Sequence, residues 1–470
     1  MEVILRNIAE MSILLDYEIF VYLYPMKFFR HLRKGISLRI INFVGLSIMF
    51  ACMLLSAGYI KRERSYDRHH THIDRIVRMT IQFNNEPIDG RVVGNTVYPI
   101  LQQIPEIEQV VKMNNIHTAV LTHQGARRVV NNFYAVSRDF LHLFDITLLH
   151  GQKEEALQQR GQAIISESFA RQLFGEIDPP ERFQASPLHI GGRQFRDTVF
   201  VSGIYKDMPQ TSHFNTDILV HLPDEINVYA YVYLLLKEHT DIDALAQKIT
   251  GLFREVESYR SENARILLTP LADIHLHSRN LREMSVNGNI HYVYLLLGAN
   301  ILLLIVVLFN LWLNASLIFS HHRRYYQLLR LHGAPSSKVF KDEAMSATLL
   351  GVLSIATGTS VAFCLLSFGG MAVDISLLLT IVLCLLFLSL VIAISLIPAL
   401  KGMATTLFLH TGNHLKPLRF SYANVKYMLT AQYAVLMVVT IVAFGINKQM
   451  NMVKDTQVGG NRQNILVMGE

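Results

Sequence analysis

Five long apolar runs, separated by polar sequence of very unequal length, constrain this chain more than any other feature. They occupy residues 38–60, 291–319, 344–368, 371–400 and 425–446. Each run is long enough to cross a bilayer core, which takes about 20 apolar residues in a helix. Composition agrees, since 51% of the 470 residues are hydrophobic and only 17% are charged. We therefore expect a membrane protein with an α-helical bundle of five transmembrane spans.

Positive charge lies at alternate ends of these runs. Bases without an acid occupy residues 26–39 and 401–424, and the loop 320–343 is also basic. Because Lys and Arg near span ends mark the cytoplasmic side, we expect these segments, and residues 1–37 as a whole, to be cytoplasmic. The polar block 61–290 is then extracytoplasmic. The net charge of +6 does not predict a nucleic-acid partner, because the positive residues are placed at the cytoplasmic ends of the apolar runs.

The polar block is expected to form a large α+β domain of two subdomains. Alternation and turn residues predict strands at 75–83, 110–113, 119–122, 128–136, 163–166, 198–205, 227–237 and 264–271. Helices are expected at 98–104, at 167–174 after a Ser166 cap, and at 241–256. The first strand has apolar residues at alternate positions, so we expect it to be half-buried. The three cysteines, Cys52, Cys364 and Cys384, all lie in apolar runs, so no disulfide is expected in this domain.

The loop between the second and third runs contains a short amphipathic segment. Residues 322–331 are predicted to be a separate basic, aromatic helix, which Gly333 ends and Pro335 keeps from continuing. Two roles are open for such a helix on these residues alone. It could rest on anionic lipid, or it could be the docking helix for a cytoplasmic partner.

Motifs for catalysis, cofactors and metals are missing from the sequence. There is no phosphate-binding G-x-x-x-x-G-K-[ST] loop, no G-x-S-x-G, no H-E-x-x-H and no C-x-x-C. His275 and His277 are expected on one face of the last strand, but no acids or cysteines at metal spacing accompany them. In the second run Asn310 and Asn314 share a helix face, where we expect hydrogen bonds to another helix. Without charged residues in mid-span, a secondary transporter is disfavoured.

Four stretches resemble motifs of a known family. Glu63–Arg78 (ERSYDRHHTHIDRIVR) resembles an E-x-S-Y-D-x-F-H and D-R-I-Y-R pattern, and Val201–Phe214 resembles V-x-G-V-x-K-D-x-P-x-x-S-H-F. Ile164–Gly175 is similar to a strand–helix motif, and Leu271–Leu276 to an L-x-D-I-H-L strand that leads back to the membrane. On these residues the chain resembles the FtsX-like permease family with a MacB-like periplasmic core domain, in the duplicated form of Bacteroidetes.

The resemblance implies a non-enzymatic permease subunit of an ABC transporter in a bacterial inner membrane. Such permeases work as homodimers or heterodimers with a separate cytoplasmic ATPase and, in some cases, a periplasmic adaptor; membrane lipids surround them, and no cofactor or metal is expected. The loop 320–343 corresponds to the coupling helix, with Arg323, Arg324, Tyr325, Arg330 and Gly333 as the expected contacts with the ATPase. This loop departs from the family pattern, since Tyr325 and Gln327 stand where Glu and Gly are usual.

The resemblance also implies a structural role for the stalk after the first run. Tyr66, Asp67, Asp74 and Arg75 are expected to fix it to the outer domain. A second, similar stalk follows the fifth run, because Gln463–Met468 resembles Asp74–Met79. Residues 447–470 are therefore expected to begin a second periplasmic domain, with the chain incomplete at its C-terminus and Met26 as its natural start.

A different class of function is a membrane-anchored sensor whose outer domain binds a ligand. Such a protein would usually carry a signalling domain inside, whereas the inner loops of this chain are short. The substrate of a transporter is not indicated by any residue of the outer block.

Overall fold

The computed structural model describes residues 36–407 except 85, 124–125, 176–186, 192–195, 224–227, 257–262 and 370–374, together with the isolated positions 427, 430, 433, 434, 437 and 448. The expected fifth span, the first 35 residues and the segment 447–470 otherwise lie outside the described residues. The chain divides into two compact units. One comprises the membrane-type helices up to Leu54 and from Ala299 onward, and the other comprises Leu55–Gly298 with residues 370–376.

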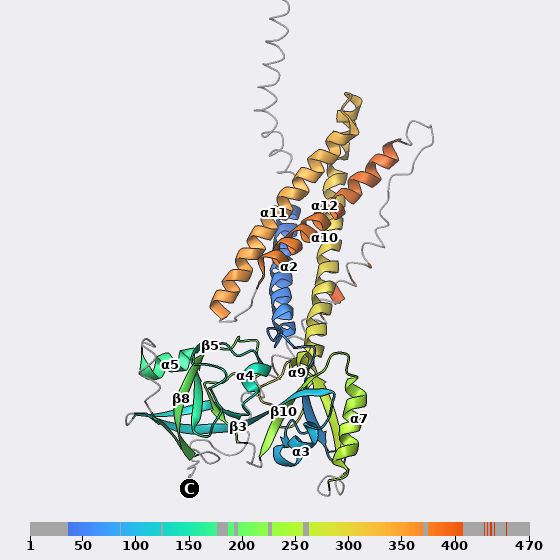
Figure 1. Ribbon diagram of the computed structural model, residues 1–470. Coiled ribbons are helices and arrows are strands. Elements are labelled where there is room, and N and C mark those ends of the chain that lie inside the picture. Colours follow the sequence, from blue (N-terminus) through green and yellow to red (C-terminus); the bar gives the residue numbers. More distant parts are fainter. Residues whose placement is uncertain are drawn as a thin grey trace, which may run out of the picture. The chain divides into compact units, whose positions relative to one another are not determined.

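Long helices make up the described part of the first unit. They are α2 (Ile36–Arg64), α10 (Ile290–Leu331), α11 (Ser336–Gly369) and α12 (Leu377–Leu407) (Figure 1). Each contains a stretch long and apolar enough to cross a membrane, at Ile36–Arg64, Ile290–His322, Ser336–Phe368 and Leu377–Lys401. Four of the expected spans are thus confirmed as long apolar helices, and the protein is a multi-pass membrane protein.

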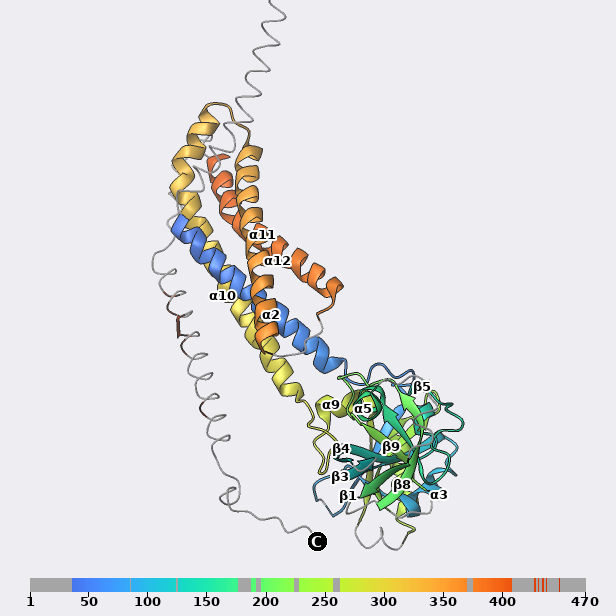
Figure 2. The same ribbon diagram turned by 90° about the vertical axis from the view of Figure 1, so that its left-hand side faces the viewer.

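Specific contacts hold these helices together, because lipid tails give little hydrophobic drive for helix association. The side-chain amide of Asn314 on α10 donates to Asn42 of α2 at 2.7 Å, which confirms the interhelical role expected of Asn314. Helix α11 packs on α12 in both views (Figures 1 and 2). It also approaches α2 closely at Gly358, where an added Cβ would lie 2.6 Å from the carbonyl oxygen of Ser47.

The second unit is built on one mixed sheet. Its described strands are β1 (Ile76–Gln82), β2 (Val92–Val93), β3 (Ile107–His123), β4 (Ala126–Val136), β5 (Leu148–His150), β6 (Gln162–Ser166), β7 (Pro187–Gly191), β8 (Arg196–Tyr205), β9 (Ile218–His221), β10 (Tyr229–Leu236) and β11 (Arg265–Pro270). Their order is β11-β1-β10-β3-β4-β9-β6-β8-β5, with β2 on β10 and β7 on β3 and β8. Two separate subdomains are therefore not confirmed, because the sheet is continuous across the domain.

Helices cover the sheet in three places and create three apolar cores. Helices α3 (Gly94–Leu101) and α7 (Ile242–Phe253) pack on one face of β1, β10 and β11. The opposite face of this half is covered by α4 (Phe140–Leu143) and α9 (Leu271–His277). At the other end of the sheet, α5 (Glu167–Phe174) packs on β6 and β8. The expected caps are confirmed: Ser166 accepts from the Phe169 N–H, and Gly175 follows the last turn.

Several sequence expectations for this unit are wrong in detail. Strand β1 is buried on both faces, not one, because its polar face lies under a chain segment that pairs with Arg78. The expected strands 110–113 and 119–122 are parts of the single 17-residue strand β3, which continues through bulges while paired with β4. The L-x-D-I-H-L stretch is helix α9 and not a strand, so His275 and His277 do not share a strand face.

The close approach at Gly358 generates a stability prediction. Alanine favours helices over glycine, so Gly→Ala at an open helix position is neutral or stabilising. At Gly358 the added Cβ meets backbone of α2, and we expect a loss of about 1–3 kcal/mol in unfolding free energy. Thermal unfolding of the purified chain in detergent measures this. Gly45→Ala is the matched control, since nothing lies within 4 Å of its Cβ position; equal effects of the two variants would contradict the packing argument.

Candidate functional site

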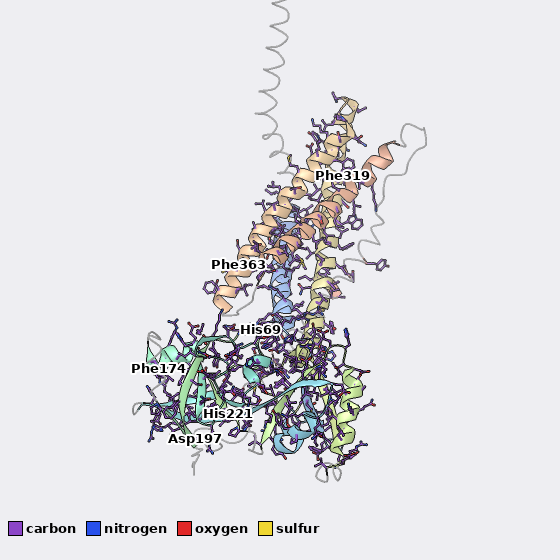
Figure 3. All side chains as sticks on the ribbon, in the orientation of Figure 1. His69, Phe174, Asp197, His221, Phe319 and Phe363 are labelled. Carbon is purple, nitrogen blue, oxygen red and sulfur yellow. The ribbon has the colours of Figure 1, made fainter. Side chains whose placement is uncertain are left out.

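The end of helix α2 is held in the outer domain by a set of buried polar contacts, which we call the stalk junction. It comprises residues 63–75, the turn 209–214, helix α9 and the segment 278–289. All of these belong to the second compact unit. Figure 3 shows His69 of this region labelled just beyond the end of α2.

Asp67 is at the centre of the stalk junction. It is fully buried and has a φ of 58°, a left-handed conformation that Asp tolerates better than most residues. Its backbone N–H donates to the carbonyl oxygen of Thr211 at 2.8 Å. Its Oδ1 accepts from the backbone N–H of His213 at 3.0 Å and lies 2.9 Å from the Nδ1 of the same histidine. Three contacts thus join the stalk to one turn more than 140 positions away in sequence.

Attraction between the Asp67 carboxylate and His213 strengthens their contact. Burial raises the pKa of Asp67, but the positive potential and hydrogen bonds of His213 outweigh it and hold the pKa below its usual value. His213 is itself anchored, since its Nε2 lies 2.7 Å from the hydroxyl of Tyr233 on β10. A buried carboxylate with such partners resists displacement, because leaving it unpaired in the interior costs several kcal/mol.

A second contact holds the last turn of α2. The Oε2 of Glu63 lies 2.9 Å from the Nε2 of His275 on α9; the histidine is buried and the Glu63 side chain is 11% exposed. The ring of Tyr66 stacks on His275 with centroids 3.4 Å apart and planes at 3°. Gly288 closes over the pair, since a Cβ there would lie 2.5 Å from Glu63 and 2.8 Å from His275. A larger residue at position 288 would push the Glu63 and His275 side chains out of their present positions.

The segment 278–289 is tied to the sheet by a buried ion pair. Arg78 of β1 donates to Glu283 at 2.6 and 2.9 Å and to the Ser278 hydroxyl at 2.6 Å. Burial raises the pKa of Glu283, but Arg78 outweighs it and leaves the pKa lowered. Arg282 also pairs with Asp89 at the sheet edge. The chain that enters α10 is therefore fixed to the same domain as the chain that leaves α2.

A histidine without polar partners lies beside these contacts. His70 is 3% exposed, packs against Phe144 and Phe214, and its two ring nitrogens have no hydrogen-bond partner among the described residues. Burial lowers the pKa of His70 to about 4, with the neighbouring His69 adding to the effect. His70 is therefore neutral near pH 7 and charges only in acid.

The structure brings together some of the predicted stalk residues and not others. Tyr66 and Asp67 both lie in the stalk junction. Arg75 forms a part-exposed ion pair with Glu108 at 3.0 Å, and Asp74 is exposed. Glu63, His213 and His275 were not among the predicted stalk residues, although all three stand in the stretches that carry the resemblance. Their partners lie 146 and 212 positions away, so local pattern does not reveal the pairing.

The predicted coupling loop takes a different form from the one expected. Residues 322–331 are not a separate helix but the last turns of the 42-residue α10, because nothing in the sequence between 319 and 322 breaks the helix. Gly333 ends it with a φ of 84°, and the Ala334 N–H donates to Leu329 at 3.0 Å, as in a Schellman cap. Arg324 and Tyr325 are exposed. Arg323 and Arg330 lie in the same helix.

Comparison with known proteins identifies the outer unit. Residues 40–252 match the family described as the MacB-like periplasmic core domain. This chain contains a MacB-like periplasmic core domain. The match includes Glu63, Tyr66, Asp67 and His213 of the stalk junction and stops before α9. The resemblance drawn from the sequence is thereby confirmed for the outer domain.

Solved structures that match part of this chain include a domain of a protein from Porphyromonas gingivalis described as a permease. It is 20% identical, covers 43% of this chain and 92% of its own, and has a TM-score of 0.36. The periplasmic region of MacB from Actinobacillus actinomycetemcomitans is 12% identical, covers 42% of this chain and 89% of its own, and has a TM-score of 0.31. No curated protein matches the chain.

The polar side chains of the stalk junction contact one another. Within the described residues, no group of three or more His, Cys, Asp or Glu side chains is placed to hold a metal ion. The polar groups of the stalk junction instead pair with one another across elements distant in sequence. Such contacts hold a helix end in a defined position on a domain.

Loss of the Asp67 charge is expected to weaken the stalk junction. Asp67→Asn keeps the side-chain shape, the Oδ1 acceptor and tolerance of the positive φ, but it removes the negative charge that attracts His213. We expect the unfolding free energy of the MacB-like domain to fall by about 1–3 kcal/mol in denaturant titrations of the full chain in detergent. Asp74→Asn is the matched control, since an exposed change has an effect within about 0.5 kcal/mol. Equal effects of the two would show that Asp67 does not anchor the stalk.

Buried neutral His70 predicts a pH dependence. Because its folded pKa is lowered to about 4 from 6.5, the unfolded chain binds a proton first as the pH falls. Stability is thus retained above pH about 6.5 and declines as the pH drops toward 4. The apparent Tm, measured at intervals between pH 7.5 and pH 4.5, should fall less in His70→Phe than in the wild type. Parallel curves for the two proteins would rule out this role for His70.

Proposed function

We propose that this chain is the permease subunit of an ABC transporter of the FtsX and MacB type. In this proposal a separate cytoplasmic ATPase hydrolyses ATP, and the permease passes the resulting helix motion to its periplasmic domain. The observation that carries the proposal is the pairing of a MacB-like domain with membrane-type helices that enter it without a break. The helix α2 contains a candidate span and extends to Arg64, one residue beyond the Glu63–His275 contact.

The stalk junction supports transmission of force and not passage of a substrate through the membrane interior. Motion of α2 reaches the domain through Glu63 and Asp67, whose partners are buried. The segment leading into α10 is held by Glu283 on Arg78. In this proposal the chain has no catalytic residues of its own, and the MacB-like domain faces the periplasm of a bacterial inner membrane, with the N-terminus and the α10–α11 turn in the cytoplasm.

The partner surface in this proposal is the end of α10. Arg324 and Tyr325 are exposed there, beside the cap at Gly333, and the basic character of residues 323–330 suits an acidic surface on the ATPase. Arg323 and Arg330 complete the proposed set. A second permease copy, alike or different, and a periplasmic adaptor are further partners that the family resemblance brings to the proposal.

A ligand-binding sensor is the alternative class. The described connection between α10 and α11 is only the turn 332–335, which is too short for a signalling domain. This observation favours the permease over the sensor.

A charge reversal tests the docking surface. Arg324→Glu should weaken co-purification of a P-loop ATPase with the affinity-tagged full chain by about tenfold, because an attractive contact becomes repulsive. Arg128→Glu, at an exposed site in the MacB-like domain, is the matched control and should leave the ATPase yield unchanged. A wild-type yield with Arg324→Glu would argue against docking at this turn. Recovery of no ATPase with the wild type would argue against the permease function itself.

A further inference from the structure

A second polar cluster lies in the membrane-type unit, where the end of α10 meets the neighbouring helices. It consists of Arg39 on α2, Tyr326 on α10, and Glu343 and Ser346 on α11, and we call it the Arg39 cluster. The Tyr326 hydroxyl donates to Oε1 of Glu343 at 2.7 Å. The Arg39 guanidinium donates to the hydroxyl of Ser346. Arg39 and Glu343 also attract each other electrostatically.

The side chains of Tyr326 and Ser346 in this cluster are buried. Tyr326 is 5% exposed, although it follows the exposed residues Arg324 and Tyr325 on α10. Ser346 on α11 is 8% exposed. The Tyr326 ring also stacks on Phe319, with centroids 5.6 Å apart. Burial and the nearby Glu343 raise the pKa of Tyr326, so its hydroxyl stays protonated and available as a donor. A hydrogen bond from a hydroxyl to a carboxylate is about twice as strong as one between neutral groups.

The cluster joins three helices at the level of the turn. Apolar side chains in a membrane bundle can slide past one another with little change in energy, whereas a buried charge keeps its partner because separation leaves it unpaired. Arg39 lies near the start of α2, and Asn42 follows one turn later with its bond to Asn314 of α10. The start of α2 is therefore bonded to both α10 and α11.

We propose that the Arg39 cluster is the element that passes movement of the α10–α11 turn to α2. Tyr326 and Glu343 are positioning residues that hold the turn, and Arg39 carries its displacement into the first span. This inference rests on the proposed permease function, since it names how that function's docking surface is connected. The exposed residues Arg324 and Tyr325 at the end of α10 bind the partner. The buried residues of the Arg39 cluster join the ends of α10 and α11 to α2.

Hydrogen exchange of the full chain in lipid nanodiscs tests the physical connection without any partner. Tyr326→Phe removes the hydroxyl and keeps the ring, so the fold should survive. We expect exchange at residues 36–43 to rise by about tenfold, although Tyr326 is not on α2. Tyr294→Phe, at an exposed tyrosine of the same helix outside the docking surface, is the matched control and should change nothing there. A change confined to α10 and α11, with α2 as in the wild type, would overturn the proposal.

A second measurement tests transmission in the assembled transporter. With the ATPase bound, addition of a non-hydrolysable ATP analogue should alter exchange at residues 63–75 in the wild type. In Tyr326→Phe the ATPase should still co-purify, but the response at residues 63–75 should be lost. A response of wild-type size would overturn the role of the cluster in transmission. If the wild type binds no ATPase, the permease function fails, and the partner-free measurement alone decides whether the cluster joins the turn to α2.

Discussion

The buried carboxylate of Asp67 is the contact on which the outer domain's hold on the first helix depends. A carboxylate in a protein interior is tolerated only where donors and positive charge surround it. Here one turn supplies the backbone N–H of His213 as a donor and places its ring Nδ1 2.9 Å from the carboxylate, and Tyr233 holds that ring in place. Moving the stalk would strip the carboxylate of these partners. One helical turn earlier, the Glu63 carboxylate likewise pairs with a histidine, His275.

The same physical rule organises the membrane-type unit. Apolar surface makes up most of each long helix, and it specifies neither register nor partner, because every such helix offers similar surface to its neighbours. Polar contacts such as Asn42–Asn314 and the Arg39 cluster are few, and each has one geometry. A close backbone approach at Gly358 adds a steric constraint of the same kind. In both units, therefore, a small number of buried polar groups fixes how helices are attached.

Prediction from the sequence succeeded where the signal was local. Runs of apolar residues predicted the four described spans, and the Ser166 cap with Gly175 predicted the bounds of α5. It failed where neighbours distant in sequence decide the outcome. Apolar and polar residues alternate along strand β1, which predicts one solvent-exposed face. Glu283 nevertheless pairs with Arg78 on that face and covers it. The stretch 271–277 follows a strand and forms a helix, with Leu271 and Ile274 directed into the core.

For the stalk junction, the sequence by itself determined that Tyr66 and Asp67 follow a membrane span and stand in a MacB-like pattern. It also determined, through the length of the apolar runs, the four long helices that could cross a membrane. Only the tertiary structure decided that Asp67 pairs with His213 and Glu63 with His275 and, in the membrane-type unit, that Tyr326 pairs with Glu343. The reason is physical. Each pair is stabilised by exclusion of water, and water is excluded only when segments far apart along the chain pack over the charged groups.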